Sequence, residues 1–201
     1  MTERPMDIAF SDSVKAQQEQ RGSRAQFQRV EQSGGWPDTI TADLAKFVSG
    51  IRSFYLGTAS SDGQPYIQHR GVPPGGLKVI DDQTLGFADY GGNKQYITLG
   101  NLAENPKAFI FMMDYARRRR VKLWGQARVV ENDAALLQSL SDATFAAPQR
   151  AILFTIAAWD RNCPQHIPQR FEAADVAAAL AERDRRIAEL EGEIATLRGD
   201  L

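Results

Sequence analysis

Two adjacent glycines followed by an asparagine and a lysine form the first candidate site for chemistry in this sequence. Gly91, Gly92, Asn93 and Lys94 follow an apolar stretch that ends at Ala88. Glycines let the backbone approach an anion closely, and a helix that starts there offers free N–H groups and the positive end of its dipole. Lys94 adds a positive charge. The turn therefore favours a phosphate site. Its spacing matches neither a Walker loop nor a dinucleotide fingerprint, and a plain turn is the commoner use of such a pair.

A second basic segment, His69 followed by Arg70, lies at the end of a predicted strand. A lone histidine on a strand is usually a packed residue, whereas an arginine there needs a charged partner or solvent. If this strand lies beside the one that ends at Asp89, Arg70 would approach the same anion as Lys94.

Four consecutive arginines occupy positions 117–120. At the entry to a strand, Arg118 and Arg120 would point the same way, and two arginines on one face suit a bidentate grip on a phosphate. The alternatives are a solvated turn or an RNA-binding patch. A nucleic-acid module would be expected to carry several basic strands with interleaved aromatic residues and a positive net charge. The net charge here is −1, so we expect no nucleic-acid partner.

A polar loop near position 160 brings Trp159, Cys163 and His166 close together in sequence. A cysteine and a histidine could act as nucleophile and base, but no third residue that would orient them is apparent. A tryptophan beside amide side chains would instead suit the edge of a planar ring. The single cysteine excludes an internal disulfide and favours a reducing compartment. With only two histidines, a metal site is not expected.

Short apolar and alternating stretches predict an antiparallel β structure. The predicted strands are 53–60, 65–72, 77–80, 84–88, 108–113, 120–131 and 151–159. The run from Ala108 to Met113 is almost continuously apolar, so we expect it to be buried on both faces. Gly125 predicts a bulge or bend. Helices are predicted at 94–104 and 134–140, and another is capped by Thr41. The pattern indicates a small antiparallel barrel with peripheral helices.

The two ends of the chain differ from this central domain. Residues 1–40 predict a polar helical arm that Trp36 anchors to the core. Residues 171–201 predict a helix with a heptad seam, in which seven of the eight seam positions are apolar. These are Val176, Leu180, Arg183, Ile187, Leu190, Ile194, Leu197 and Leu201. A dimeric coiled coil is the favoured interpretation, and an amphipathic helix on its own domain is the alternative. No apolar run could span a bilayer, and we expect no membrane partner and a cytoplasmic protein.

In order along the chain, these motifs resemble the pyridoxamine 5′-phosphate oxidase-like family of FMN-binding split barrels. The resemblance covers about two thirds of the chain, from Thr41 to the loop near Gln169. It rests on 54–65, 68–71, 85–89 with Asn93 and Lys94, the 101–113 helix-to-strand pattern, and 121–127. It implies a six-stranded antiparallel split β-barrel, mainly β in class (α+β), at residues 41–170. It also implies a homodimer with FMN at the interface.

The resemblance also assigns residues to the cofactor. The segment from His69 to Val72, including Arg70 and Gly71, would run along the flavin. The other residues so assigned, which include the basic pair considered above, are Phe87, Ala88, Gly92, Asn93, Lys94, Arg118, Arg120 and Trp159.

The sequence also departs from the family pattern. Asn93 stands where true oxidases have arginine, and the loop from Pro73 to Gly76 interrupts the strand that normally supplies a phosphate-binding lysine. The C-terminal arginine and histidine motif that grips pyridoxine phosphate is not found.

The resemblance therefore predicts an FMN-dependent oxidoreductase of unknown substrate, with no protein acid or base assigned. Two alternatives remain open. One is a flavin or anionic-ligand binding protein without turnover. The other is a split barrel that takes a deazaflavin or haem, the latter through His69 or His166.

Overall fold

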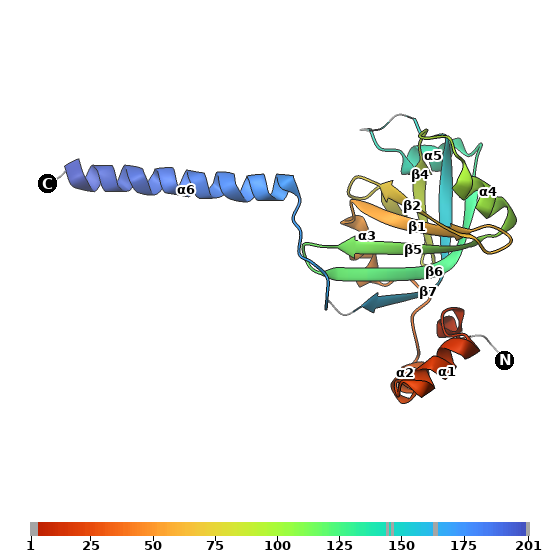
Figure 1. Cartoon of the computed structure of the whole chain (residues 1–201). Helices are drawn as coiled ribbons and strands as arrows, with labels where there is room; N and C mark the ends of the chain where they lie inside the picture. Colours follow the sequence, from red (N-terminus) through yellow and green to blue (C-terminus); the bar gives the residue numbers. More distant parts are fainter. Residues whose placement is uncertain (1–3, 144, 146, 163–164, 200–201) are drawn as a thin grey trace. The chain divides into compact units, whose positions relative to one another are not determined.

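A computed structural model describes residues 4–143, 145, 147–162 and 165–199. Its main feature is one seven-stranded sheet, which Figure 1 shows curled on itself. The strands are β1 (Ser53–Ala59), β2 (Pro65–Gly71), β3 (Leu77–Val79), β4 (Thr84–Asp89), β5 (Lys107–Asp114), β6 (Arg119–Val130) and β7 (Arg150–Asn162). The strand order β2-β1-β5-β6-β7-β4-β3 leaves β2 and β3 at the edges. The expected antiparallel split barrel is confirmed, with seven strands instead of six because the short β3 joins the same sheet.

Helices lie before, between and after the strands. They are η1 (Pro5–Ile8), α1 (Asp12–Gln20), α2 (Arg24–Gln32), α3 (Ala42–Ser49), α4 (Ile97–Glu104), α5 (Ala134–Leu140) and α6 (Ala173–Gly199). The predicted cap at Thr41 is confirmed, and Asp133 caps α5. The Thr41 hydroxyl accepts a hydrogen bond from the Leu44 N–H at 3.3 Å, and the Asp133 carboxylate accepts one from the Leu136 N–H at 2.9 Å. Such caps fix where a helix begins because they satisfy N–H groups that have no partner within the helix.

The core fills the inside of the curled sheet. Side chains alternate along each strand, so Phe54 and Leu56 of β1 point inward and are fully buried. The Phe54 ring meets the Phe87 ring of β4 edge-on, with centroids 5.0 Å apart. These two strands are not neighbours in the sheet, so the contact joins its two halves across the interior.

The strand β5 is buried on one face and half-buried on the other. Ile110 and Met112 are fully buried, whereas Phe109 and Phe111 are only partly covered. The expectation that this segment is buried on both faces is therefore wrong. Phe109 and Phe111 instead give the outer face of the sheet a partly exposed aromatic surface.

Gly125 marks the predicted irregularity in β6. The register with β7 shifts between Trp124 and Gly125, which confirms a bulge or bend there. A Cβ atom at this position would collide with the carbonyl oxygen of Thr155. The close approach of the two backbones therefore requires glycine.

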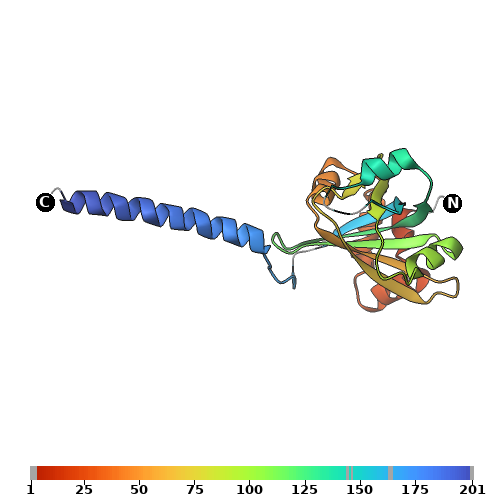
Figure 2. The same cartoon turned by 90° about the horizontal axis from the view of Figure 1, so that it is seen from above.

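The helix α4 begins later than predicted. It starts at Ile97 instead of Lys94, because Lys94 and Tyr96 both adopt left-handed backbone angles with φ of 56°. A residue with positive φ does not continue a right-handed helix. The segment 90–96 is therefore a loop, and α4 lies beside the β1–β2 hairpin (Figure 2).

The N-terminal helices belong to the same compact unit as the sheet. Met6 of η1 is 1% exposed, and this helix contacts β7. Trp36 stacks on Trp124 of β6, with centroids 4.8 Å apart and planes 16° apart. The predicted anchor at Trp36 is thus confirmed, and Met6 is a second attachment that was not predicted.

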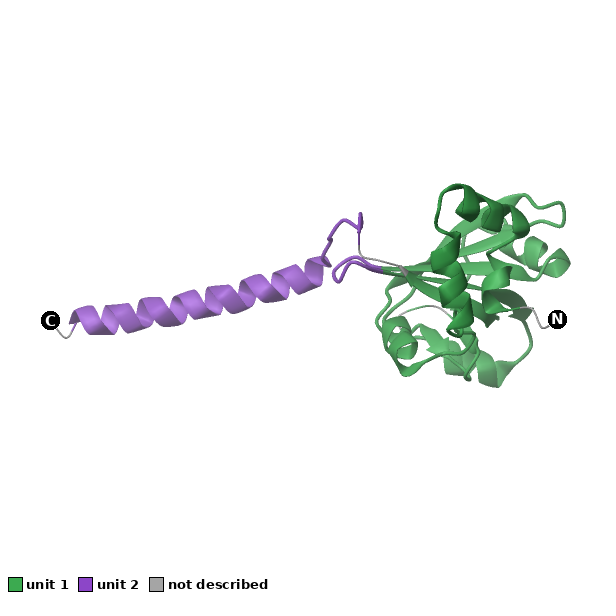
Figure 3. Ribbon diagram, turned by 90° about the horizontal axis from the view of Figure 1, so that it is seen from below, with its two compact units in different colours: residues 1–113, 120–163 green, residues 114–119, 164–201 purple. Residues whose placement is uncertain are grey.

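The chain divides into two compact units, coloured in Figure 3. The first holds residues 1–113 and 120–163, and the second holds 114–119 and 164–201. Within the second unit, the Gln169 side chain donates to the Ala116 carbonyl at 2.8 Å, and Arg170 lies over the Tyr115 ring. The longest element of this unit is the helix α6.

Candidate functional site

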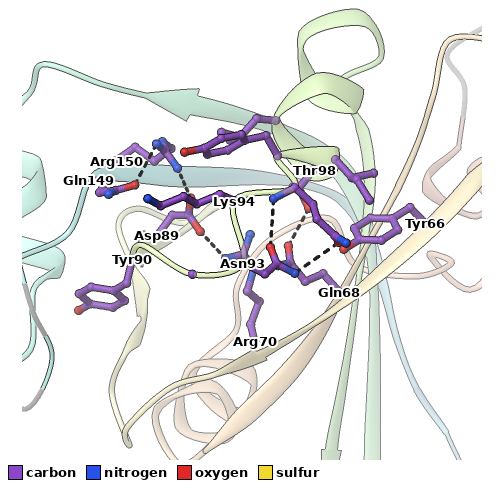
Figure 4. Close-up of a pocket in the computed structure, with 15 residues that line it drawn as sticks. Tyr66, Gln68, Arg70, Asp89, Tyr90, Asn93, Lys94, Thr98, Gln149 and Arg150 are labelled. Carbon is purple, nitrogen blue, oxygen red and sulfur yellow. Dashed lines mark hydrogen bonds and ion pairs between the residues drawn. The ribbon is translucent and has the colours of Figure 1, made fainter.

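A cavity of about 260 Å³ opens at the split in the barrel, between the edge strand β2 and the end of β4. It is formed by alternate residues of β2, the end of β4, the loop before α4, the start of α4, and the start of β7 (Figure 4). Its lining residues are Tyr66, Gln68, Arg70, Asp89, Tyr90, Gly92, Asn93, Lys94, Gln95, Tyr96, Ile97, Thr98, Leu99, Gln149 and Arg150. The cavity thus contains three cationic side chains and one carboxylate.

Asp89 is the centre of the charged group. Its carboxylate accepts hydrogen bonds from the guanidinium groups of Arg70 and Arg150, the latter at 2.8 Å (Figure 4). The side chains of all three residues are 15% exposed or less. Arg150 stands opposite Asp89 in the β4–β7 pairing, whereas Arg70 reaches Asp89 from β2 across the split.

Burial alone would lower the pKa of Arg150, because desolvation disfavours a charged group. The hydrogen bond and negative charge of Asp89, with a further contribution from Glu131 at 3.2 Å, outweigh that effect and raise the pKa of Arg150. Arg150 therefore stays positively charged beside the cavity at any physiological pH. Its Cζ also lies 5.8 Å from the centroid of the Tyr96 ring, which the cation can contact favourably.

Two cationic side chains at this site have donor groups without a partner in the described chain. The Nε of Arg70 is buried and has no hydrogen-bond partner in the described chain. Lys94 makes no ion pair with any described residue, although three charged groups lie around the same cavity. An unpaired buried donor such as the Arg70 Nε is rare in folded proteins because it costs desolvation energy. Lys94 is exposed and carries no such cost. A bound anion would give both groups a partner.

The loop before α4 presents its side chains at the mouth of the cavity. The Asn93 side chain accepts a hydrogen bond from the Gln95 N–H at 3.3 Å, which holds the turn locally. The Thr98 hydroxyl donates to the Gln68 side chain at 2.8 Å and ties α4 to β2. These two hydrogen bonds hold the backbone on either side of Lys94.

Comparison with known proteins assigns the fold to a family. Residues 40–163, more than half of the chain, match the pyridoxamine 5′-phosphate oxidase family. The chain belongs to this family. A comparison with curated proteins found no match.

Solved structures agree with the family fold. HupZ from Group A Streptococcus is similar with a TM-score of 0.51 and 16% identity, over 66% of this chain and 99% of HupZ. A variant of HupZ gives 0.51 and 17%, over 61% and 99%. A protein related to general stress protein 26, of the pyridoxinephosphate oxidase family, from Clostridium acetobutylicum, gives 0.46 and 14%, over 65% and 92%. At these identities the two HupZ structures support the fold alone.

Within this pyridoxamine 5′-phosphate oxidase fold, four predicted site residues line the cavity. They are Arg70, Gly92, Asn93 and Lys94. The glycine turn is placed as expected, but the helix dipole is not at Gly92, since α4 begins five residues later.

Five more predicted residues do not line the cavity but come from the strands beside it. His69 and Gly71 alternate with Arg70 and are exposed on the other face of β2. Phe87 is 1% exposed in the core, and the Cζ of Arg70 lies 5.7 Å from its ring centroid. Ala88 packs instead with Leu140 and Ala151 in a small cluster beneath α5. Val72, just beyond β2, packs partly against the core.

Three predicted residues do not lie at the cavity. Trp159 is 7% exposed in the core, and its indole N–H donates to the Thr39 carbonyl at 2.8 Å. Arg118 has a φ of 54° in the turn before β6 and belongs to the second unit, so the expected alternation with Arg120 does not start at that residue. Arg120 lies on the outer face of β6, with its Cζ 5.8 Å from the centroid of the Phe111 ring.

Arg150 and the role of Asp89 do not follow from any pattern in the sequence. Arg150 immediately precedes a predicted apolar strand, and it meets Asp89 only through the β4–β7 register. No local motif signals that pairing. The alternation of Tyr66, Gln68 and Arg70 on β2 was a signal that could have identified two more cavity residues.

The remaining hypotheses from the sequence find no support at this site. Cys163 lies outside the described residues, and His166 is exposed in the second unit. The described residues include no group of acidic, cysteine and histidine side chains that could hold a metal ion. Among the described helices, none is long and apolar enough to cross a bilayer.

Proposed function

We propose that this member of the family is an FMN-dependent oxidoreductase whose cavity at the barrel split holds the phosphate end of the cofactor. The observation that carries the proposal is the charge of that cavity, where Arg70, Lys94 and Arg150 outnumber the single carboxylate of Asp89. A dianionic phosphate would balance that excess. It would also give partners to the free donors of Arg70 and Lys94.

The size of the cavity supports a phosphate site that extends beyond one subunit. About 260 Å³ is less than the volume of roughly 300–1,000 Å³ typical of pockets that enclose a whole ligand. The cavity would therefore hold the phosphate and part of the attached chain. The flavin ring would extend past it, along the neighbouring edge of β2.

The residues of the cavity favour a cofactor that brings its own chemistry. Among the lining residues there is no histidine or cysteine, and the one carboxylate is already held by two arginines. When bound, the flavin supplies hydride transfer. The role of this chain is to bind the phosphate, orient the ring and exclude water. The same observation supports the second candidate, a protein that binds flavin or another anionic ligand without turnover.

We also propose that two copies pair through the outer face of the sheet, with the cofactor between them. That face carries aromatic residues on adjacent strands. The ring centroids of Tyr55 and Phe111 lie 6.4 Å apart, and Ile67 is 68% exposed. Arg120 lies on the same face, and its buried Nε has no hydrogen-bond partner among the described residues. A second subunit would cover this apolar surface and could satisfy Arg120.

The proposed compartment is the cytoplasm, which the single cysteine supports. The proposed FMN domain is residues 41–170, with the arm before it and the helix α6 after it.

Titration with FMN tests the site. Lys94→Ala should weaken FMN binding by about 1.5–3 kcal/mol, which is the usual contribution of a charge-assisted hydrogen bond and corresponds to about tenfold to a hundredfold in Kd. Lys107→Ala is the matched control, because Lys107 is exposed at the start of β5 and does not line the cavity. An unchanged Kd for Lys94→Ala would contradict the site.

Turnover separates the two candidates. An oxidoreductase should show reduction of the bound flavin by NADH or NADPH, followed by reoxidation with an acceptor over repeated cycles. Tight FMN binding without any reduction by either donor would favour the binding protein.

A further inference from the structure

The helix α6 has an apolar side with no partner in the described chain. It runs without interruption through 27 residues, Ala173–Gly199, all of them described, and none of its side chains is buried. Apolar residues recur along it in a heptad pattern. The exposed fractions are 43% for Val176, 50% for Leu180, 49% for Ile187, 40% for Leu190, 48% for Ile194 and 68% for Leu197.

A helix with this pattern needs a partner to be stable. Most helical stability in proteins comes from packing of an apolar face, and isolated helices are marginal in water. The apolar side of α6 is a narrow seam at two positions per heptad, which is the pattern of a coiled coil. With Ile187 and Ile194 at one position and Leu190 and Leu197 at the other, it matches the side-chain preference of parallel two-stranded coiled coils.

We propose that α6 pairs in parallel with α6 of a second copy of this chain. The charged residues beside the seam favour this partner and this direction of pairing. In a parallel pair, Arg186 of one helix faces Glu191 of the other, and Glu193 faces Arg198. Both contacts join opposite charges, and each occurs twice across the two-fold axis.

Three of these four charged residues are without an ion pair in the single chain. Within the described residues, Glu191, Glu193 and Arg198 have no salt bridge, and Arg186 pairs at 3.0 Å with Glu189 of its own helix. Other charges of α6 already form pairs within the helix, such as Arg185 with Glu189 at 2.6 Å. The unpaired charges therefore lie beside the seam, where a second helix would meet them.

An antiparallel pair fits the same charges less well. If Ile187 packs against Leu190 of the other helix, Arg186 meets Glu193, but Asp184 meets Glu191 and the two like charges repel. A parallel pair has no such contact between these positions. The direction of pairing also decides how far apart the two preceding domains lie, because α6 is about 40 Å long at 1.5 Å per residue. Only parallel pairing keeps the two preceding domains at the same end of the helices.

The one charged residue within the seam also finds a partner in the parallel arrangement. Arg183 replaces an apolar residue in the second of the two seam positions. In a parallel pair a side chain at that position packs beside the next residue of the facing helix. For Arg183 that residue is Asp184 of the other copy, so the two charges can form an ion pair. A polar residue in a seam fixes register at some cost in stability.

Disulfide cross-linking of the full chain tests partner and direction together. In a Cys163→Ser background, Leu197→Cys places a thiol on the seam, and Ala195→Cys places one on the outer side of the same turn as the matched control. Parallel pairing predicts that mild oxidation cross-links Leu197→Cys at least several-fold more than Ala195→Cys at micromolar concentration. Leu180→Cys should also cross-link with itself.

Two results would overturn the proposal. Antiparallel pairing would leave Leu197→Cys and Leu180→Cys unlinked when alone and would link them only when mixed. A helix that folds back on its own chain, or that binds another partner, would give no seam-specific cross-link in any of these samples.

Charge reversal provides an independent test with the Leu197→Cys readout. Glu191→Arg with Glu193→Arg makes all four facing positions positive, and Arg186→Glu with Arg198→Glu makes them all negative. Each variant alone should lose most of its cross-linking, and an equimolar mixture should recover it. Glu182→Arg with Glu189→Arg carries the same charge change away from the seam and should still cross-link. Failure of the mixture to recover would contradict the facing pairs, whether or not the chain binds FMN.

Discussion

Arg70 and Asp89 form an ion pair that joins β2, at one edge of the sheet, to β4, the sixth strand in the order. No backbone hydrogen bonds link these strands, so side chains close the barrel at its split. Arg150 binds the other oxygen of the same carboxylate from β7. The group that closes the barrel is thus also the group that gives the cavity its charge.

Asp89→Asn should destabilise the fold strongly. Removing one partner of a buried charge pair leaves an uncompensated charge, which typically costs about 3–5 kcal/mol. Here two buried arginines would lose their carboxylate at once. Urea unfolding at pH 7 measures the loss. As a control, Arg161→Gln breaks the exposed Arg161–Asp43 pair, whose side chains are 50% and 53% exposed, and should cost about 1 kcal/mol or less. Equal losses for the two variants would contradict the role given to Asp89.

Gly125→Ala should also destabilise the protein, for a purely steric reason. The added Cβ would collide with the Thr155 carbonyl oxygen and lie 3.0 Å from Cζ of Phe154, so the β6–β7 pairing must shift. Overpacking of this kind costs about 1–3 kcal/mol or more. Gly100→Ala in α4 adds the same methyl group where no atom lies within 4 Å. It should be neutral or stabilise by up to about 1 kcal/mol. If the bulge is rigid, thermal unfolding should show a lower Tm for Gly125→Ala and an equal or higher Tm for Gly100→Ala.

Trp36→Ala should loosen the N-terminal helices while leaving the barrel folded. The stack on Trp124 would be lost, and with it the edge contact to Phe10 at 5.2 Å. Aromatic pairs contribute about 0.5–1.5 kcal/mol beyond the area they bury. Limited proteolysis should therefore cut residues 12–35 several-fold faster than in the wild type. Trp36→Phe keeps an aromatic ring and should be intermediate. Equal cleavage of all three proteins would mean that Met6 alone holds the arm.

The strands could be predicted well because the signals that specify a strand lie within a few neighbouring residues of the sequence. Alternation and turn residues placed both hairpins, and the bulge at Gly125 follows from a glycine within a strand. The loop before α4 was mispredicted because Lys94 and Tyr96 take left-handed angles that their side chains do not signal. The Arg70–Asp89–Arg150 group depends on the curl of the whole sheet. The sequence predicts only that Arg70 approaches the end of β4, and it does so on the condition that the strand of Arg70 lies beside the strand that ends at Asp89.

Acid should destabilise the N-terminal helices through Glu31, which pairs with Arg24 within α2, while Arg24 also donates to Gln18 of α1 at 2.9 Å. Two hydrogen bonds from Arg24, at 2.7 and 2.9 Å, lower the pKa of Glu31 against the opposing effect of its burial. A carboxylate whose folded pKa is lowered stabilises the fold above its unfolded pKa, about 4.3 for glutamate. That contribution is lost as pH falls through the folded value. The free energy of unfolding should therefore fall from pH 5 toward pH 3, in part because Glu31 is protonated.

A double-mutant cycle isolates this effect from the other carboxylates. Glu31→Gln and Arg24→Gln should each flatten the dependence of unfolding free energy on pH below pH 5, and the double variant should flatten it no further. The cycle is informative because residues in one hydrogen-bonded pair are not additive. If Glu31→Gln unfolds with the same pH dependence as the wild type, the Arg24–Glu31 pair does not stabilise the N-terminal helices. The acid sensitivity of the arm would then have to come from Asp7, whose pKa is lowered by its hydrogen bond with Lys15.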